Sequence, residues 1–262
     1  MLIALAARGV EPELLVGTSV GAVNAAWLAG HPGLDGAREL ADVWRSVRRA
    51  DVFPSRPLLG LLGFAGRRDH LVSADPLRRL VGRHLTLDRL EHAPIPLHVV
   101  ATDLTTGEEV LVSEGDALDA VAASAAIPGV FPPVPLGGRI LVDGGVSSNV
   151  PIAHAVERGA TTVYVLPTGY ACALHSAPRS ALGVALQSIS LLLQQRLAAD
   201  IVRFSGEVDL RVLPPLCPLS VLPIDFSHSA DLIARSVTLS AAWLDRGDWS
   251  SAVEILALHE HI

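Results

Sequence analysis

The stretch LLVGTSVGAVNAAWLAG, residues 14–30, holds one serine between two glycines and carries no charged side chain. Residues 14–17 form a short apolar run that predicts a buried strand, and the small apolar residues 20–28 predict a helix packed closely on a sheet. The stretch is nearly long enough to cross a bilayer, but its three glycines and one asparagine make it a poor membrane helix. We therefore expect a strand, a tight turn and a helix, with Ser19 at the turn.

Residues 17–21, GTSVG, match the pattern GxSxG, in which a strained turn lifts a serine hydroxyl onto the N-terminus of a helix. We expect Gly17 and Gly21 to be required because side chains at these positions would collide with the turn. The amide of Val20 would offer one hydrogen-bond donor to the oxyanion of a reacting ester. The alternative is a glycine-permitted turn whose serine only caps the following helix.

A serine hydroxyl is a poor nucleophile at neutral pH, so a catalytic Ser19 needs a base within hydrogen-bond reach. Asp143 is the candidate, because it lies in RILVDGG, residues 139–145, which is interpreted as a strand entering a glycine turn, and it precedes Gly144 and Gly145. Two glycines at this point would let another backbone segment or a substrate approach. The alternative is an ordinary loop turn, for which Asp-Gly is a favoured pair.

A Ser-His-Asp triad is the rival arrangement, and its histidine should follow the acid in the sequence. His154, His175 and His228 satisfy that order, although each is otherwise interpreted as a surface or capping residue. Ser124 lacks flanking glycines, so we interpret it as part of a loop wall beside the site and not as a second nucleophile.

Strands and helices alternate along the rest of the chain, which predicts an α/β fold with a mainly parallel sheet between helical layers. Half of the residues are apolar but only 4% are aromatic, so the core must be built mostly from Ala, Val, Leu and Ile. That composition suits a sheet covered on both faces. No Gly/Ser-rich, Pro-rich or charged linker interrupts the pattern, so we expect residues 1–262 to form a single domain.

Charge and motif content exclude several other classes of function. The net charge is −7, all basic residues are arginine, and no basic cluster is present, so nucleic acid is not expected as a partner. Cys172 and Cys217 lie too far apart for a CxxC site, and no metal or nucleotide motif occurs, so we expect no metal and no cofactor. A reducing, cytoplasmic setting fits these cysteines and the absence of signal-peptide features in MLIALAARG.

Three motifs in order resemble the patatin-like phospholipase family, in its bacterial branch: GTSVGAVNA, ASAAIPGVFPPV at residues 123–134, and VDGGVSSNVPI at residues 142–152. The segment PPLCPLSVLPIDFSHSADLI is also similar to that branch. The resemblance implies a three-layer α/β/α sandwich that hydrolyses lipid acyl esters with a Ser-Asp dyad. Ser19 would be the nucleophile and Asp143 the base, and the reaction would pass through an acyl-enzyme.

The sequence departs from this family at its beginning. Members begin with a strand and a glycine-rich loop whose amides form the oxyanion hole, and neither precedes the GTSVG motif here. Either an internal methionine was taken as the start, or the chain is naturally shortened. We expect the chain as written to be a weak or inactive hydrolase and an upstream-extended chain to be active. A catalytically impaired lipid-binding protein and a triad hydrolase or acyltransferase are the alternatives.

A segment rich in leucine, residues 57–68, suggests a contact with a lipid surface. Its apolar side chains could form a flap with arginines turned toward headgroups; they are Leu58, Leu59, Leu61, Leu62 and Phe64. The alternative is a loop whose leucines cover the core. The partners expected from the sequence are therefore a lipid ester and, transiently, a membrane surface, and the oligomeric state is left open.

Overall fold

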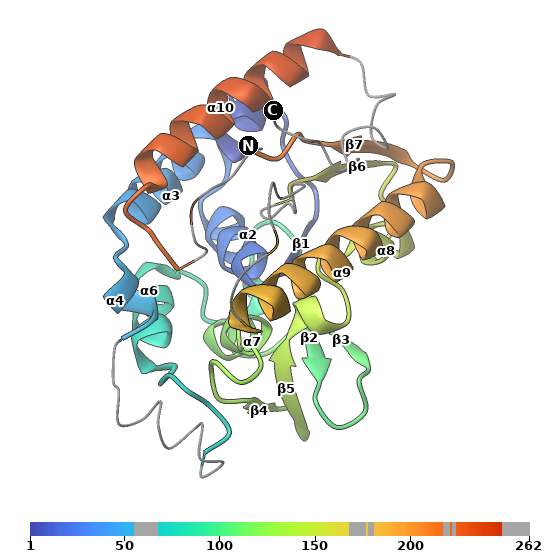
Figure 1. Ribbon diagram of the computed structural model, residues 1–262. Coiled ribbons are helices and arrows are strands. Elements are labelled where there is room, and N and C mark those ends of the chain that lie inside the picture. Colours follow the sequence, from blue (N-terminus) through green and yellow to red (C-terminus); the bar gives the residue numbers. More distant parts are fainter. Residues whose placement is uncertain (55–67, 168–176, 178–180, 217–220, 222–223, 248–262) are drawn as a thin grey trace. The chain divides into compact units, whose positions relative to one another are not determined.

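The computed structural model describes residues 1–54, 68–167, 177, 181–216, 221 and 224–247 (Figure 1). The chain divides into two compact units. Residues 9–151 and 222–229 form the first, here called the sheet unit, and residues 1–8, 152–221 and 230–262 form the second. The single domain expected over residues 1–262 stays a prediction. Both Ser19 and Asp143 belong to the sheet unit.

The sheet unit alternates strands with helices, as the sequence predicts. Its strands are β1 (Leu15–Thr18), β2 (Leu97–Asp103), β3 (Glu109–Val112), β4 (Val134–Leu136) and β5 (Arg139–Asp143). The described helices of this unit are α2 (Val20–Gly30), α3 (Gly33–Ser46), α4 (Arg49–Val52), α6 (Asp75–His84) and α7 (Ala117–Ser124), with 3-10 turns η1 (Leu90–His92) and η2 (Gly144–Val146).

The register of the sheet places two strands on one edge of β2. β1 runs parallel to β2 and pairs with residues 97–100, whereas β5 runs antiparallel to β2 and pairs with residues 101–103. β3 is antiparallel to β2 along residues 99–102, so it occupies the opposite edge. β4 lies beyond β5 and is antiparallel to it. Figure 1 shows β2, β3 and β5 side by side, with β4 next to β5.

The expected mainly parallel sheet is mixed in its described part because two of its strands return through short hairpins. Gly137 and Gly138 form a two-residue turn between β4 and β5, and both have positive φ angles. Two-residue hairpin turns of type I′ require positive φ at both positions, which glycine adopts without steric cost.

Helices α2 and α7 pack on the sheet through small side chains. Ala22, Ala26 and Ala29 of α2 are at most 1% exposed, so this helix lies close to the strands. They share one apolar cluster with Val99 of β2 and Val121 of α7. α3 is tied to α2 by a hydrogen bond of 2.8 Å from the Trp44 indole to the Asn24 side chain. The core next to the site is therefore built from alanine and valine.

The second unit contains a parallel strand pair and helices. Its described elements are α1 (Leu2–Ala6), α8 (Ile152–Glu157), β6 (Thr162–Val165), α9 (Ala181–Phe204), β7 (Asp209–Val212) and α10 (Ser229–Arg246). β6 pairs in parallel with β7 along all four residues. Arg8 joins the end of α1 to α10 through an ion pair of 2.6 Å with Asp245.

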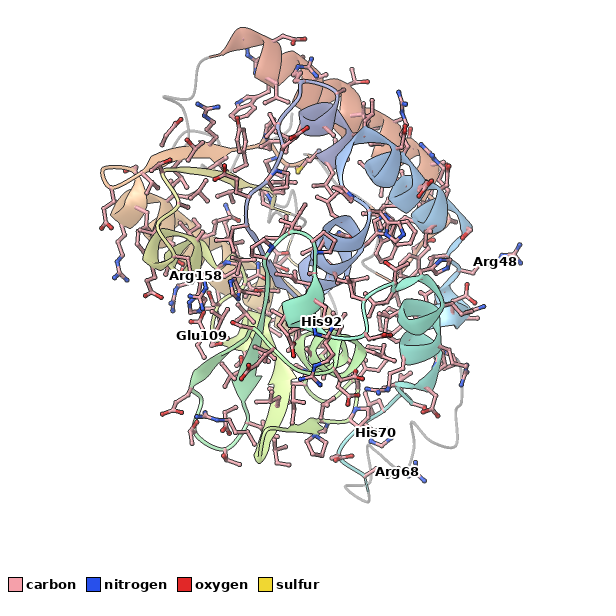
Figure 2. All side chains as sticks on the ribbon, turned by 180° about the vertical axis from the view of Figure 1, so that it is seen from behind. Arg48, Arg68, His70, His92, Glu109 and Arg158 are labelled. Carbon is pink, nitrogen blue, oxygen red and sulfur yellow. The ribbon has the colours of Figure 1, made fainter. Side chains whose placement is uncertain are left out.

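The apolar flap predicted at Leu58, Leu59, Leu61, Leu62 and Phe64 lies outside the described residues. Within the part of the chain that the structure describes, no helix combines the length and the apolar character that crossing a membrane requires. Arg48 points away from the ribbon (Figure 2).

Candidate active site

Strands β1 and β5 end against each other on the same edge of β2. Thr18, the last residue of β1, is paired with Val100, and Asp143, the last residue of β5, is paired with Ala101. Because β1 is parallel to β2 and β5 is antiparallel to it, their C-terminal ends point toward each other. Neighbouring residues of a strand lie about 3.3 Å apart, so this register brings together two chain segments that are distant in the sequence.

Ser19 lies at the sharp turn between β1 and α2. Its hydroxyl donates a hydrogen bond of 2.6 Å to Oδ2 of Asp143. Its backbone has φ 54° and ψ −126°, and it is the one non-glycine residue with positive φ in the described ranges. Such a conformation costs an ordinary residue about 1–3 kcal/mol and persists only where the surroundings enforce it. The strained turn aims the hydroxyl at the carboxylate.

Asp143 is buried and held on several sides. Its side chain accepts the amide of Gly145 at 2.8 Å through Oδ1, in addition to the Ser19 hydroxyl at Oδ2. Its own amide donates to Ala126 O at 2.9 Å, and its carbonyl accepts the Thr102 hydroxyl at 3.1 Å. Burial raises the pKa of the Asp143 carboxyl, and the hydrogen bonds from Ser19 and Gly145 lower it by less. The result is a carboxylate of increased basicity in contact with a hydroxyl.

Two glycines allow these segments to approach each other. A Cβ atom on Gly17 would lie 2.6 Å from Ala22 Cα, and one on Gly144 would lie 2.3 Å from the carbonyl oxygen of Val100. A Cβ on Gly145 would lie 3.1 Å from Asp143 Oδ1, which is tight but less severe. Gly17 and Gly144 are therefore required by backbone packing at the ends of β1 and β5.

The expected requirement for Gly21 is wrong in the described structure. A Cβ atom there meets nothing within 4 Å, and the residue has no positive φ. Gly21 lies in the first turn of α2 with its missing side chain directed into open space. Its role in the GxSxG pattern is therefore not to prevent a collision within the turn.

The N-terminus of α2 provides backbone donors beside Ser19. The amides of Ala22 and Val23 both donate to Ser19 O, so the helical hydrogen bonds begin there. The amides of Val20 and Gly21 precede them, and such first-turn amides have no partner within their helix. A helix N-terminus of this kind favours negative charge. The Val20 amide is adjacent to the nucleophile candidate, as the sequence predicts.

Ser124 lies beside the site, as expected from the sequence, but in a different element and bonded directly to Ser19. Its interpretation as part of a loop is corrected by the structure, because Ser124 is the last residue of α7 and is fully buried. Its Oγ accepts the Ser19 amide at 2.9 Å and donates to Val100 O at 2.6 Å. Only the position of Ser124 at the start of the ASAAIPGVFPPV motif marks it in the sequence.

The candidate histidines have other recorded partners. His228 lies 3.8 Å from Asp225, and His154 lies 3.3 Å from Glu157. His175 lies outside the described residues. In the described ranges no histidine is recorded as a hydrogen-bond partner of Ser19 or Asp143. No group of three or more His, Cys, Asp or Glu side chains suited to a metal ion occurs in those ranges either.

Comparison with known proteins assigns the chain to a family. Residues 1–156 match the model of the family described as patatin-like phospholipase, which is more than half of the chain. The chain belongs to the patatin-like phospholipase family. This patatin-like chain has the three-layer α/β/α architecture of its family, which confirms the fold class expected from the sequence.

Curated relatives of the patatin-like chain include two uncharacterised NTE family proteins of Mycobacterium tuberculosis. One is 32% identical over 148 residues, covering 56% of this chain and 24% of the relative. The other is 33% identical over 154 residues, covering 57% and 39%. Patatin-like phospholipase domain-containing protein 6 of Mus musculus is 26% identical over 171 residues, covering 64% and 12%. The matched part of the chain thus spans less than half the length of each of these relatives. Together these matches support a lipid hydrolase function in general terms.

Proposed function

We propose that this patatin-like chain hydrolyses acyl esters of lipids with Ser19 as the nucleophile and Asp143 as the general base. The observation that carries the proposal is the 2.6 Å hydrogen bond from Ser19 Oγ to Asp143 Oδ2. A nucleophile and its base must lie within hydrogen-bond reach, about 2.6–3.2 Å, for the proton to be transferred as the new bond forms. The carboxylate also has a raised pKa because it is buried, which brings its basicity closer to that needed at neutral pH.

The proposed reaction has two steps that both use Asp143. Asp143 takes the hydroxyl proton while Ser19 Oγ bonds to the ester carbonyl carbon, and the carbonyl oxygen becomes an oxyanion. Collapse of this intermediate breaks the bond to the alcohol oxygen, which receives the proton from Asp143. Water then attacks the acyl-enzyme, gives its proton to Asp143, and releases the fatty acid as the proton returns to Ser19.

The N-terminus of α2 supports the charge that develops in both steps. The Val20 amide follows the nucleophile directly and would donate to the oxyanion, and the helix dipole favours negative charge there. Removing one such donor typically slows a reaction about 10²–10³-fold. The Ser19 amide is not available for this role because it donates to Ser124.

The direct contact between hydroxyl and carboxylate favours a dyad over a triad, since no ring nitrogen stands between them in the described site. A lipid-binding protein without catalysis is the second candidate. It would not need the strained backbone of Ser19, and the φ of 54° therefore argues for the enzyme. The proposal includes transient contact with a lipid surface, because the substrate is a lipid. It also includes the cytoplasmic location expected from the sequence.

A fluorophosphonate probe and a phospholipid vesicle assay test the proposal together. Labelling at Ser19 and release of fatty acid, weak in the chain as written and stronger in an upstream-extended chain, are both expected to be lost in Ser19→Ala. The three single changes His154→Ala, His175→Ala and His228→Ala are expected to retain activity. A folded, upstream-extended chain that binds vesicles but is never labelled would instead support the lipid-binding protein.

A further inference from the structure

The hydrogen bonds of Ser124 show how the turn at Ser19 leaves the sheet. Along a parallel strand, alternate residues donate to the same neighbour. The Leu15 amide donates to Pro96 O at 2.9 Å. The two-residue repeat continues through Gly17, so the next amide in the series is that of Ser19, and its acceptor in a regular ladder would be Val100 O.

The Ser124 hydroxyl occupies the place of that hydrogen bond. It accepts a hydrogen bond from the Ser19 amide at 2.9 Å and donates one to Val100 O at 2.6 Å. The hydrogen-bond ladder between β1 and β2 is thereby extended through one side-chain oxygen, in place of a direct hydrogen bond from the Ser19 amide to Val100 O. This inserted hydroxyl lets the backbone of Ser19 leave the plane of the sheet while its amide remains bonded.

We propose that Ser124 is a positioning residue that holds Ser19 in its left-handed backbone conformation and so aims the Ser19 hydroxyl at Asp143. Ser124 is fully buried, and both hydrogen bonds of its hydroxyl are made to the backbone. The Val100 carbonyl it binds also lies against Gly144, the residue that follows Asp143. Ser124 therefore fixes Ser19 to the same point of β2 that positions the carboxylate.

The catalytic consequence rests on the proposed function, but the structural role does not. Without the hydroxyl, the part-buried Ser19 amide and the buried Val100 carbonyl both lose their partner, which costs free energy. The backbone of Ser19 is then free to relax from its strained conformation, and the Oγ to Oδ2 distance lengthens. A displacement of about 1 Å at a reacting atom can slow catalysis about 10²-fold.

Ser124→Ala tests the proposal with two measurements on the full chain. The first is hydrogen exchange of the Ser19 amide, followed by NMR, which we expect to become about tenfold faster or more as the amide loses its acceptor. The second is the kinetics of ester hydrolysis, where we expect kcat to fall about 10- to 10²-fold with a much smaller change in KM. A merely structural role would not affect the exchange of the Ser19 amide selectively, and it would not change kcat without changing KM.

Ser240→Ala is the matched control. Ser240 is also a fully buried serine, it lies in α10 of the second unit, and no partner of its hydroxyl is recorded among the described residues. Both measurements are expected to equal those of the wild-type chain. Ser124→Cys is the second variant, because the thiol is a weak acceptor and donor of similar shape. It is expected to give intermediate values. If Ser124→Ala does not fold, this variant decides whether Ser124 positions Ser19.

Unchanged exchange of the Ser19 amide in a folded Ser124 variant would overturn the proposal. So would faster exchange with a wild-type kcat, because positioning would then have no effect on the reaction. If neither the wild-type chain nor an upstream-extended chain is labelled at Ser19 or active, the proposed function fails. The exchange comparison still decides in that case whether Ser124 holds the turn, so the two failures are distinguishable.

Discussion

The backbone of Ser19 has a conformation that serine adopts only when its surroundings impose it. The angles φ 54° and ψ −126° match the first central residue of a type II′ turn, a position dominated by glycine. We expect the free energy of unfolding of Ser19→Gly to be about 1–2 kcal/mol higher than that of Ser19→Ala, because glycine relieves the strain and alanine does not. Chemical denaturation of both variants measures the difference, and neither carries the hydroxyl.

The control for this comparison is Ser46, an exposed residue at the end of α3 with ordinary helical geometry. There the order should reverse, with the glycine variant about 1 kcal/mol less stable than the alanine variant. The same order at both positions would show that the turn at Ser19 is not strained.

At the scale of elements, the junction of β1 and α2 depends on one glycine of the GxSxG pattern and not on the other. Gly17→Ala places a Cβ 2.6 Å from Ala22 Cα, so α2 must shift. We expect a loss of about 1–3 kcal/mol or more from this overpacking. The Cβ added by Gly21→Ala would lie in open space on a helix. We expect this variant to be neutral or to raise the free energy of unfolding by up to about 1 kcal/mol. Thermal unfolding of the two variants side by side makes the test, and equal losses would contradict the packing described here.

Local signals predicted the elements that carry the site, but not how they meet. The apolar run before Ser19 and the small residues after it predict a strand and a helix, and the structure has β1 and α2 there. The two-residue turn at Gly137 and Gly138 reverses the direction of β5 relative to β4. The antiparallel pairing of β5 with β2 is a long-range choice, and no periodicity within residues 139–143 encodes it.

Two particular residues show where sequence reasoning stops. Gly21 matches the motif, yet its space is open, because a pattern records which residue is present and not what surrounds it. Ser124 carries no local mark of function, yet it bonds to a residue 105 positions earlier in the chain. Its role depends on the register of β1 on β2, which only the folded chain shows.

At the scale of the whole molecule, Asp143 couples stability to pH. Burial raises its pKa in the folded state, so the folded chain holds this proton more tightly than the unfolded chain. Its contribution to stability is therefore greatest below the unfolded pKa and decreases as pH rises through the folded pKa. We expect Asp143→Asn, which cannot ionise, to gain stability relative to the wild-type chain across that window and to keep the gain at higher pH.

Urea denaturation at a series of pH values measures this gain. Asp42→Asn is the control, because Asp42 forms an exposed ion pair with Arg45 at 2.6 Å and such pairs contribute little. A stability difference between Asp143→Asn and the wild-type chain that does not depend on pH would contradict the raised pKa. Lost activity together with gained stability is the combination expected of a residue kept for chemistry.

The most direct test of the account is the pH dependence of fluorophosphonate labelling at Ser19. In the wild-type chain the labelling rate should rise with pH as Asp143 loses its proton, and then level off. In Asp143→Asn the rate should be about 10²–10⁴-fold lower, and it should lack that rise, because no carboxylate accepts the hydroxyl proton. If Asp143→Asn is folded and labels Ser19 at the wild-type rate with the wild-type pH profile, Asp143 is not the base.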